Sequence, residues 1–394
     1  MKILFDLNSL RPPRSGIGYY TLHLLEGLRA RPEIDDLAGW VGSEVYANQR
    51  LNALMCDDAA LQKAAQFSDG VFAMALRTAR NLPGVYDART VVRGVKSSRL
   101  RREFGQRGYL YHETNFVASP FNGPSVVTIH DLSHRRFPAF HPQVAVDYLD
   151  KNLPRTFRQV QAVIADSVYT KNEIHELYGL PDAKVTAIPL GVEPAFQPYD
   201  EADCTPELAA LGLGYRRFVL SVCTLQPRKN LQRLVEAFMR LPSDLRDAYP
   251  LVLTGAQGWM NSALLRDLEP LVQARQAVLP GYVSRRALLR LFASATVFAY
   301  PSLYEGFGLP VAEAMASGAP VLTANVTSLP EVVAGAAWEV DPYSVDAIAA
   351  GLERLLSDAP LRAELAAKGR RRAAELTWEA TVDRTCGVYR SVVG

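Results

Sequence analysis

Two adjacent cations follow a short apolar run and precede a segment of helical period. Arg228 and Lys229 come after the run FVLSVCT, and the helical pattern begins near Leu231. An anion gains there from fixed charge, from unpaired backbone N–H groups and from the helix dipole. Adjacent cations exposed to solvent are common and usually carry no meaning. Here their place at the carboxyl end of a predicted strand favours a phosphate site.

A second group of residues combines two carboxylates with two glycines in PSLYEGFGLPVAEAMASGAPVL. Glu305 follows a predicted strand, and Glu313 falls within the next predicted helix. Gly306 and Gly308 allow backbone N–H groups to face a ligand, and Pro310 suits a first helical turn. Backbone N–H groups would hold a diphosphate, and carboxylate oxygens would accept hydrogen bonds from hydroxyls of a nucleotide sugar. The simpler alternative is a turn in which Glu313 only complements the helix dipole.

Polar residues also follow the predicted strands SVVTI and AVIAD in the first half of the chain. His130 comes directly after SVVTI, and ligands of open α/β sheets bind beyond the carboxyl ends of strands. The alternative is a histidine held for structural reasons beside a helix cap supplied by Asp131. Ser167 ends the second strand and is predicted to be a helix N-cap, which alone would explain it.

The first predicted strand leads into the loop NSLRPPRSGIGYYT, which carries Gly16 and Gly18 before a helix. A dinucleotide fingerprint needs a tight turn and a third glycine, but about eight residues intervene and Thr21 takes the third place. NAD binding is therefore rejected. A loop with Arg14 remains, where an anion or a sugar could approach bare backbone N–H groups. A loop that needs glycines at positive φ is an equally open alternative.

The predicted strands and helices that must position these residues alternate regularly along the chain. Apolar runs rich in β-branched residues alternate with helical segments, from ILFDL to KVTAIPL and again from RFVLSVCT to APVLTA. This alternation predicts parallel strands joined by crossover helices. The Pro- and Gly-containing stretch 193–214 is predicted to be a linker, so two doubly wound α/β domains follow. The last run, WEATVDRTCGVYRSVV, is predicted to be a helix whose apolar stripe must be buried.

Composition limits the class of protein. The chain has 394 residues, 48% hydrophobic and 21% charged, as expected for a soluble globular protein of two to three domains. Its four cysteines lack metal-ligand spacing, and no apolar run reaches the 18 or so residues of a membrane span. We expect a cytoplasmic protein. The net charge of +2 is unevenly distributed along the chain. Residues 77–108 contain nine cationic residues and two carboxylates, a net charge of +7, which leaves −5 for the rest of the chain.

The motifs together resemble the retaining glycosyltransferase family 4. The resemblance rests on the E-x7-E pattern from Glu305 to Glu313, on LQPRKNL upstream and on GAQGW and LPGYVS between them. It covers nearly the whole chain. Through RSGIGYYT, TIHDLSHRRFPAFHP and ADSVYTKNEI the chain is most similar to bacterial O-polysaccharide mannosyl- and rhamnosyltransferases of that family.

The resemblance implies the GT-B fold, in which two Rossmann-like doubly wound domains face a central cleft. Residues 1–195 would form the acceptor-binding domain, with 377–394 packing back on it as a crossing helix. Residues 196–376 would form the donor-binding domain, which holds the nucleotide sugar.

The resemblance also implies roles for individual residues. Arg228 and Lys229 would hold the donor diphosphate, and Glu305 the transferred sugar and phosphate. Glu313 would bind the nucleotide ribose, and His130 would contact the donor sugar near the reacting carbon. The other implied donor-binding residues are Gly16, Gly255, Gly281, Tyr282, Val283, Gly306, Phe307, Gly308 and Leu309. The first loop departs from the family's frequent double glycine, since the sequence there is Ser15-Gly16-Ile17-Gly18.

The implied reaction moves a hexose of mannose or rhamnose type to a saccharide acceptor with retention, in bacterial surface polysaccharide synthesis. A GDP-linked donor and a lipid-linked acceptor are expected, and a UDP-hexose is the alternative donor. The chain has no Asp-x-Asp motif, so we expect no metal and no other cofactor. Arg228, Lys229 and helix N-termini would then neutralise the leaving diphosphate. No nucleophile is evident, which favours same-face attack with proton transfer to the departing phosphate oxygen.

Other functions use similar residues. A nucleotide-sugar 2-epimerase shares the fold and a diphosphate site, and a non-catalytic sugar-nucleotide-binding protein would need only the binding residues. The basic segment 77–108 could be a solvated loop or a docking surface for anionic lipid headgroups at the inner face of the plasma membrane. Nucleic acid would also suit a basic patch, but no recognition motif accompanies it, so no nucleic-acid partner is expected.

Overall fold

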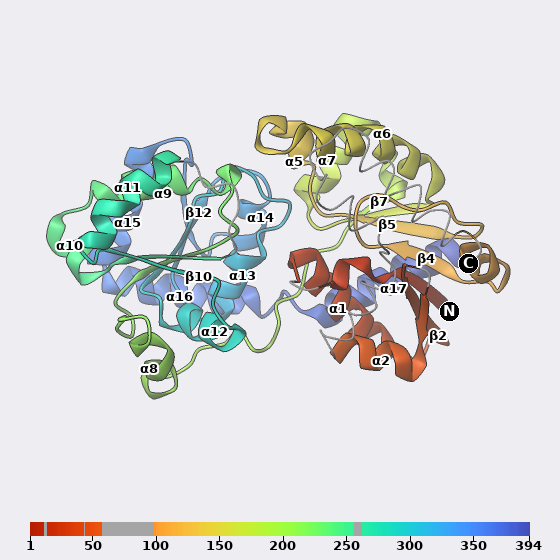
Figure 1. Ribbon diagram of the computed structural model, residues 1–394, viewed down its shortest axis with the longest axis horizontal. Helices are drawn as coiled ribbons and strands as arrows, with labels where there is room; N and C mark the ends of the chain where they lie inside the picture. Colours follow the sequence, from red (N-terminus) through yellow and green to blue (C-terminus); the bar gives the residue numbers. More distant parts are fainter. Residues whose placement is uncertain (12–13, 43, 57–97, 99, 256–261) are drawn as a thin grey trace, which may run out of the picture. The chain divides into compact units, whose positions relative to one another are not determined.

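A computed structural model describes residues 1–11, 14–42, 44–56, 98, 100–255 and 262–394. The chain divides into two compact units, one of Met1–Leu190 with Trp378–Gly394 and one of Gly191–Thr377. Each unit has a central sheet with helices around it (Figure 1). The basic segment 77–108 lies outside the described residues except for residues 98 and 100–108. Within the described ranges, no helix is long and apolar enough to cross a bilayer.

The N-terminal unit is built on a seven-stranded sheet of order β3-β2-β1-β4-β5-β6-β7. Its strands pair in parallel except for β2 and β3, which are antiparallel. The strands are β1 (Lys2–Asp6), β2 (Asp36–Val41), β3 (Glu44–Ala47), β4 (Leu110–Glu113), β5 (Ser125–Ile129), β6 (Ala162–Ala165) and β7 (Val185–Ala187). The α-helices are α1 (Gly16–Arg29), α2 (Asn48–Cys56), α5 (Ser133–Arg136), α6 (Gln143–Gln159), α7 (Val168–Tyr178) and α17 (Trp378–Val393).

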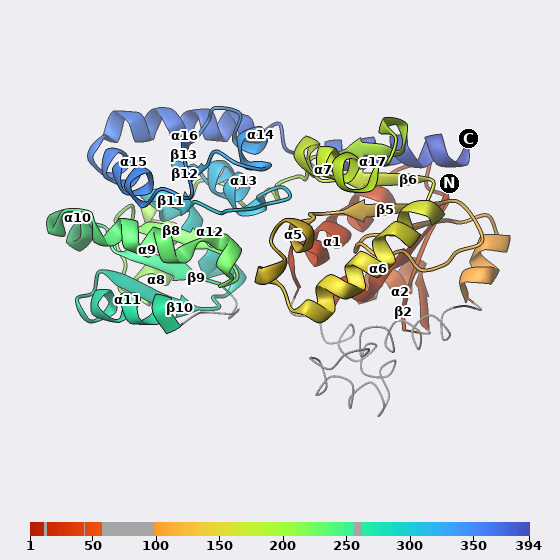
Figure 2. The same cartoon turned by 90° about the horizontal axis from the view of Figure 1, so that it is seen from above.

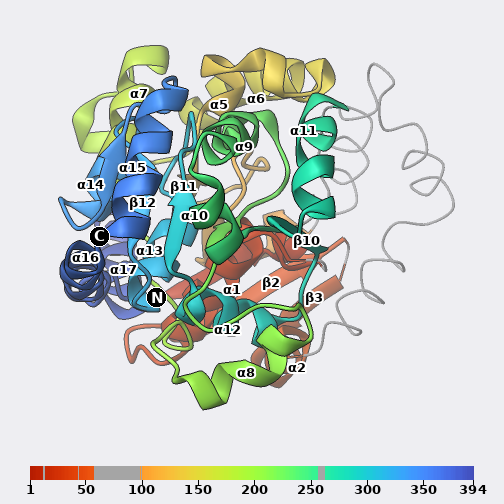
Figure 3. The ribbon, with the colours of Figure 1, turned by 90° about the vertical axis from the view of Figure 1, so that its left-hand side faces the viewer.

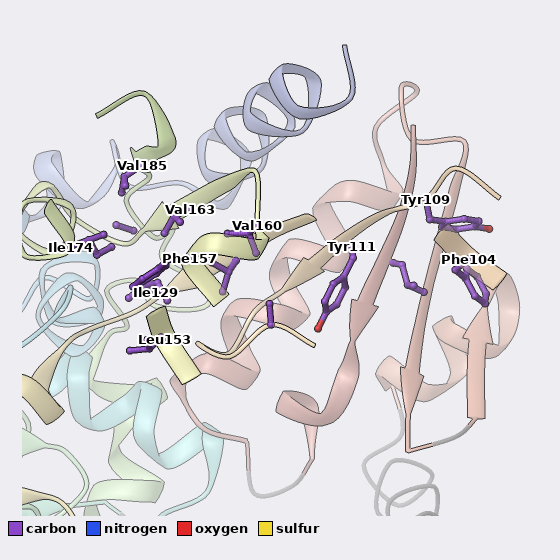
Figure 4. Close-up of a cluster of buried hydrophobic side chains, with 14 of the residues drawn as sticks. Phe104, Tyr109, Tyr111, Ile129, Leu153, Phe157, Val160, Val163, Ile174 and Val185 are labelled. Carbon is purple, nitrogen blue, oxygen red and sulfur yellow. The ribbon is translucent and has the colours of Figure 1, made fainter. Parts of the chain in front are cut away.

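The core of this unit fixes β5 and β6 between layers of apolar side chains. Leu153 and Phe157 of α6 and Ile174 of α7 belong to the same buried cluster as Ile129 of β5 and Val163 of β6 (Figure 4). All five side chains are at most 4% exposed. A strand buried on both faces reads as a continuous apolar run, which explains the sequences SVVTI and AVIA. The carboxyl ends of β5 and β6 are therefore held firmly.

The C-terminal unit has a six-stranded, wholly parallel sheet of order β10-β9-β8-β11-β12-β13. Helix α11 lies beside β10 at one edge, and α15 and α16 pack near β13 and β12 (Figure 3). The strands are β8 (Val219–Val222), β9 (Leu251–Thr254), β10 (Ala277–Gly281), β11 (Val297–Tyr300), β12 (Val321–Ala324) and β13 (Trp338–Val340). The α-helices are α8 (Glu201–Ala209), α9 (Leu231–Met239), α10 (Ser243–Ala248), α11 (Ser262–Gln273), α12 (Arg285–Ser294), α13 (Leu309–Ala316), α14 (Leu329–Val333), α15 (Val345–Ser357) and α16 (Ala359–Ala373).

Both units place their first strand inside the sheet, with the chain winding outward on either side of it. This is the doubly wound arrangement, and it confirms the predicted pair of α/β domains. The strand order reverses between β1 and β4 in one unit and between β8 and β11 in the other. Ligands of such sheets bind at the carboxyl ends of the strands near this reversal.

The last helix, α17, belongs to the N-terminal unit, where it packs on α1 and runs beside β6 (Figure 2). Val382 and Tyr389 on its apolar stripe are fully buried, as the sequence predicts. Gly27 of α1 permits the close approach, since a Cβ there would lie 2.4 Å from Val382 Cγ2. The Thr381 hydroxyl donates to the Pro189 carbonyl at 2.8 Å and ties the start of α17 to this unit.

Candidate active site

The cationic pair occupies one 3-10 turn, Pro227–Lys229, between the carboxyl end of β8 and α9. Asn230 closes this turn in the left-handed conformation, with φ of 60°. Its side-chain Nδ2 donates to the carbonyls of Pro301 at 2.9 Å and Pro342 at 2.7 Å. Asn230 thereby anchors the turn to the loops after β11 and β13. Asn230 was not among the predicted site residues, although an Asn directly before a helical pattern is an N-cap signal.

Lys229 and Glu305 form a buried ion pair at the carboxyl edge of the sheet. Lys229 Nζ lies 2.6 Å from Glu305 Oε1, and the two residues are 8% and 5% exposed. Lys229 Nζ also donates to the Tyr300 hydroxyl at 2.8 Å, and the Ser302 hydroxyl donates to Glu305 Oε1 at 2.6 Å. Arg228 Nη1 lies 3.5 Å from Glu305 Oε2. Residues 76 positions apart meet because β8 and β11 are neighbours.

The two cations share one carboxylate, and this decides the charge of the cluster. Burial raises the pKa of Glu305, but the charges of Lys229 and Arg228 outweigh burial and hold that pKa below its ordinary value. Burial also lowers the pKa of Lys229, with a smaller contribution in the same direction from Arg228. Glu305 therefore stays ionised. An arriving phosphate would meet surplus positive charge and a backbone carrying N–H donors.

The glycine turn after Glu305 opens helix α13. Gly308 stands at the N-cap with φ of 102°, a conformation that favours glycine, and a Cβ there would also displace the end of the Leu329 side chain, 2.6 Å away. Pro310 lies in the first helical turn, as the sequence predicts. Glu313 follows one turn later and is half-buried between fully buried neighbours. The turn brings the start of a helix beside the ion pair, which suits a phosphate.

Two hydroxyl residues from the loop after β12 support this turn. Ser328 is fully buried, and its Oγ lies 2.9 Å from the Phe307 carbonyl and 3.0 Å from the Glu305 carbonyl. Thr327 Oγ1 accepts a hydrogen bond from the Glu305 backbone N–H at 3.2 Å. Thr327 has φ of 59°, an unfavourable conformation for a β-branched residue. The sequence offered no signal for this support, because it comes from a different strand.

The residues implied to meet the base lie at the carboxyl ends of β9 and β10. The Gly281 carbonyl accepts from Gly255 N at 3.1 Å and from the Thr254 hydroxyl at 2.6 Å. Gly255 has φ of 146°, and a Cβ there would lie 2.0 Å from the Cys223 carbonyl oxygen. Packing within the sheet alone therefore requires glycine at 255. Tyr282 is 76% exposed, and Val283 beside it is half-buried.

His130 lies at the carboxyl end of β5 in the N-terminal unit, and both of its ring nitrogens have partners. Nδ1 lies 2.7 Å from Asp166 Oδ2, and Nε2 lies 2.8 Å from the Thr114 carbonyl oxygen. Tyr20 and Phe116 meet the ring edge-on, with centroids 5.1 and 5.8 Å away. Three adjacent strand ends, those of β4, β5 and β6, thus hold one imidazole.

The residues that follow β5 and β6 near His130 form local capping hydrogen bonds. Asp131 Oδ1 accepts from the Ser133 backbone N–H at 2.9 Å and from the Ser133 hydroxyl at 2.7 Å. Ser167 accepts from Thr170 N at 3.0 Å and caps α7, as the sequence predicts. The structural alternative that the sequence left open for His130 is therefore present in the fold. Asp166 was not among the predicted site residues, although it follows a buried strand directly, in the same way as His130.

Gly16 begins α1 directly after its N-cap, Ser15. Among the described residues, no atom outside its chain neighbours and its own helix lies within 4 Å of the position that a Cβ of Gly16 would take, so these contacts do not require this glycine. Gly18 differs, because its Cβ would lie 2.7 Å from the Ser9 carbonyl oxygen. Of the two glycines, only Gly16 leaves open space at the helix N-terminus for a ligand.

Comparison with known proteins assigns the family. The model described as glycosyl transferases group 1 matches residues 210–372, and that of glycosyltransferase family 4 matches residues 97–196. O-antigen chain mannosyltransferase B of Escherichia coli is 32% identical over 390 residues, which span 99% of this chain and 100% of that protein. The chain belongs to glycosyltransferase family 4 and is a hexosyltransferase.

Solved structures agree on the fold. HepE of Anabaena, in complex with UDP and glucose, superposes with a TM-score of 0.69 at 18% identity, over 99% of this chain and 100% of that chain. WaaG, a glycosyltransferase of lipopolysaccharide biosynthesis, gives 0.67 at 15% identity, over 98% and 99%. The two α/β units, each built on a mainly parallel sheet, have the GT-B fold, as predicted.

Proposed function

We propose that this enzyme transfers a mannosyl residue from a GDP-linked donor to a saccharide acceptor of a bacterial surface polysaccharide. The observation that carries the proposal is the full-length similarity to an O-antigen chain mannosyltransferase. The cluster of Arg228, Lys229 and Glu305 supports it, because its charge suits a nucleotide diphosphate. A UDP-hexose is the second candidate donor, favoured by the likeness to HepE, which was solved with UDP and glucose.

We propose for these residues the roles that the family resemblance implies, and the geometry of the cluster is compatible with them. Lys229 and Arg228 bind the diphosphate, and Glu305, held by Ser302, accepts hydrogen bonds from hydroxyls of the transferred sugar. Glu313 accepts from the nucleotide ribose. As the bond to the sugar breaks, negative charge grows on the leaving phosphate and is stabilised by cations that are already in place.

We propose retention of configuration, with attack on the same face of the sugar and transfer of the acceptor's proton to the departing phosphate oxygen. The two cations would do the work of a metal, and the chain has no Asp-x-Asp motif. Turnover should survive EDTA. Activity lost on chelation and restored by Mn²⁺ or Mg²⁺ would contradict this part of the proposal.

A donor panel tests the substrate. The purified enzyme is incubated with GDP-mannose, GDP-rhamnose, UDP-glucose or UDP-galactose and a mannose-terminated oligosaccharide. We expect GDP-mannose to be at least about tenfold better than either UDP-hexose in kcat/KM, and NMR to show an α-linked product from the α-configured donor. A faster reaction with a UDP-hexose would establish the second candidate, and a β-linked product would exclude retention. Epimerised donor without acceptor would indicate an isomerase.

A lipid-linked acceptor and a peripheral place at the inner face of the plasma membrane complete the proposal. The same oligosaccharide is offered with and without a polyprenyl diphosphate carrier. We expect the carrier to lower KM, and binding to vesicles to rise with their anionic lipid content. Equal KM values and vesicle binding that ignores lipid charge would remove both statements.

A further inference from the structure

The imidazole of His130 has an acceptor on each side. The Thr114 backbone carbonyl can only accept, so Nε2, at 2.8 Å, must carry a hydrogen. Asp166 Oδ2 lies 2.7 Å from Nδ1, and an ionised carboxylate also only accepts. The shared proton belongs on the ring, because imidazole is the stronger base by more than two pKa units. The geometry therefore describes an imidazolium paired with a carboxylate.

The pair is enclosed. The side chains of His130 and Asp166 are 11% and 3% exposed, so water screens the pair little. Asp166 Oδ1 is buried and has no hydrogen-bond partner in the described part of the chain, which leaves the imidazolium as this carboxylate's main stabilising contact.

The charged and titratable groups facing the ring come from four elements. Asp166 directly follows β6, and Asp131 is the residue after His130 itself; both carboxylates favour the charged ring. Burial opposes the charge on His130, but these carboxylates and the Thr114 carbonyl outweigh it and raise the pKa of His130. Tyr20 of α1 is held neutral, since burial and Asp166 raise its pKa. His112 of β4 is also neutral, because burial lowers its pKa to about 3.

We propose that His130 is a permanently protonated, fixed cation at the carboxyl end of β5, and that Asp166 is the positioning residue that keeps it charged and oriented. Neither ring nitrogen is then available to take or give a proton during transfer. The inference rests on the proposed function for its kinetic meaning: the acceptor's proton goes to the departing phosphate oxygen, and His130 contributes only charge and a rigid edge.

Histidine ring nitrogens report the protonation state without any substrate. Long-range ¹H–¹⁵N correlation spectra of ¹⁵N-histidine-labelled wild type are recorded between pH 5.5 and 9, with His130→Gln identifying the signal. We expect both nitrogens of His130 to stay protonated up to pH 8. A neutral His130 at pH 7.5 in the folded wild type would overturn the proposal, whatever the donor proves to be.

Kinetics then test the role of Asp166. In Asp166→Asn the ring loses its counter-charge, so kcat should fall at least tenfold at pH 8 and recover as the pH is lowered to 5.5, with KM for the donor little changed. The kcat of the wild type should show no histidine ionisation between pH 5.5 and 8. The matched control is Asp150→Asn, which removes the carboxylate 3.6 Å from His134 and should leave the profile unchanged. An Asp166→Asn enzyme with wild-type kcat and pH profile would refute the positioning role.

Discussion

The two units build similar sheets yet equip the carboxyl ends of their strands differently. The C-terminal unit presents Arg228 and Lys229, two cations that share the carboxylate of Glu305. The N-terminal unit presents His130, whose two nitrogens are both committed to groups of the same unit. In the C-terminal unit the cations are those that we propose bind the donor diphosphate, whereas in the N-terminal unit the charge of His130 is held by groups of its own unit.

The two units also differ in their histidine content. All six histidines lie in the N-terminal unit, at positions 23, 112, 130, 134, 141 and 175. The C-terminal unit therefore has no group with an ordinary pKa near 6.5. Mild acid should therefore change the stability of the two units by different amounts.

The largest expected effect removes the buried cation of the C-terminal unit. Lys229→Ala leaves the Glu305 carboxylate buried without its closest cation, which should cost about 3–5 kcal/mol of unfolding free energy and abolish transfer. In the double variant Lys229→Met, Glu305→Leu, most of the stability should return while activity stays absent. Urea unfolding and donor turnover measure the two quantities. An active double variant would show that the pair is only structural.

Arg228 should matter for catalysis more than for folding, because it is partly exposed. Arg228→Ala should lower kcat/KM by about a hundredfold, which is about 3 kcal/mol of lost charge stabilisation. Arg240→Ala is the control, since Arg240 pairs with Asp346 at the exposed end of the neighbouring helix. Near-wild-type turnover in Arg228→Ala would remove the phosphate assignment and with it the contrast between the units.

Acid should destabilise the N-terminal unit first. Burial, and to a lesser extent the charge of His130, lower the pKa of His112 to about 3, so the unfolded chain takes up a proton that the folded chain refuses. This contribution to stability is complete above pH 6.5 and shrinks as the pH falls, by about 2 kcal/mol at pH 5. His134, with a pKa lowered to about 4, acts in the same direction.

His112→Gln should flatten this acid dependence. The measurement is calorimetry between pH 6.5 and 5, because the raised pKa of His130 acts in the opposite direction above pH 6.5. In wild type the N-terminal transition should move down while the C-terminal one stays, and the variant should lose much of that shift. Two transitions that fall in parallel would mean that the histidines do not distinguish the units.

The smallest expected effect concerns Ser328, which supports the glycine turn after Glu305. Ser328→Ala leaves the carbonyls of Glu305 and Phe307 without their buried hydroxyl, at a cost of about 1 kcal/mol. Because the turn then holds Glu305 less firmly, kcat/KM should fall several-fold. Ser344→Ala, which removes only the cap of α15, should cost similar stability with no change in turnover. Equal kinetic effects in both variants would deny Ser328 a part in the site.

Much of the fold could be predicted from local pattern. The run SVVTI coincides with β5, and RFVLSVCT and TVFAY contain β8 and β11, because buried parallel strands leave continuous apolar runs. The apolar pattern does not predict strand β4, since its sequence LYHE carries three ionisable residues although all four residues are buried. His112 is one of them, and its partners Tyr389 and Thr128 come from α17 and β5.

The candidate site divides in the same way. Glu305 and Lys229 could be singled out by residue type, motif and place at a strand end, but not as partners, because their contact depends on the adjacency of β8 and β11. Gly255 was assigned to the ligand, while the fold supplies a packing reason for it in the Cys223 carbonyl. Thr327 and Ser328 carried no signal at all.

The amino-acid sequence is enough to predict the family, the pair of α/β domains and the charged side chains at the ends of strands. These follow from residue types and short-range periodicity, which any local stretch of chain expresses. The tertiary structure decided which charges meet and which ionisation state they hold. Lys229 reaches Glu305, and His130 reaches Asp166 and Thr114, only because strand order brings distant segments side by side in surroundings with little water to screen them.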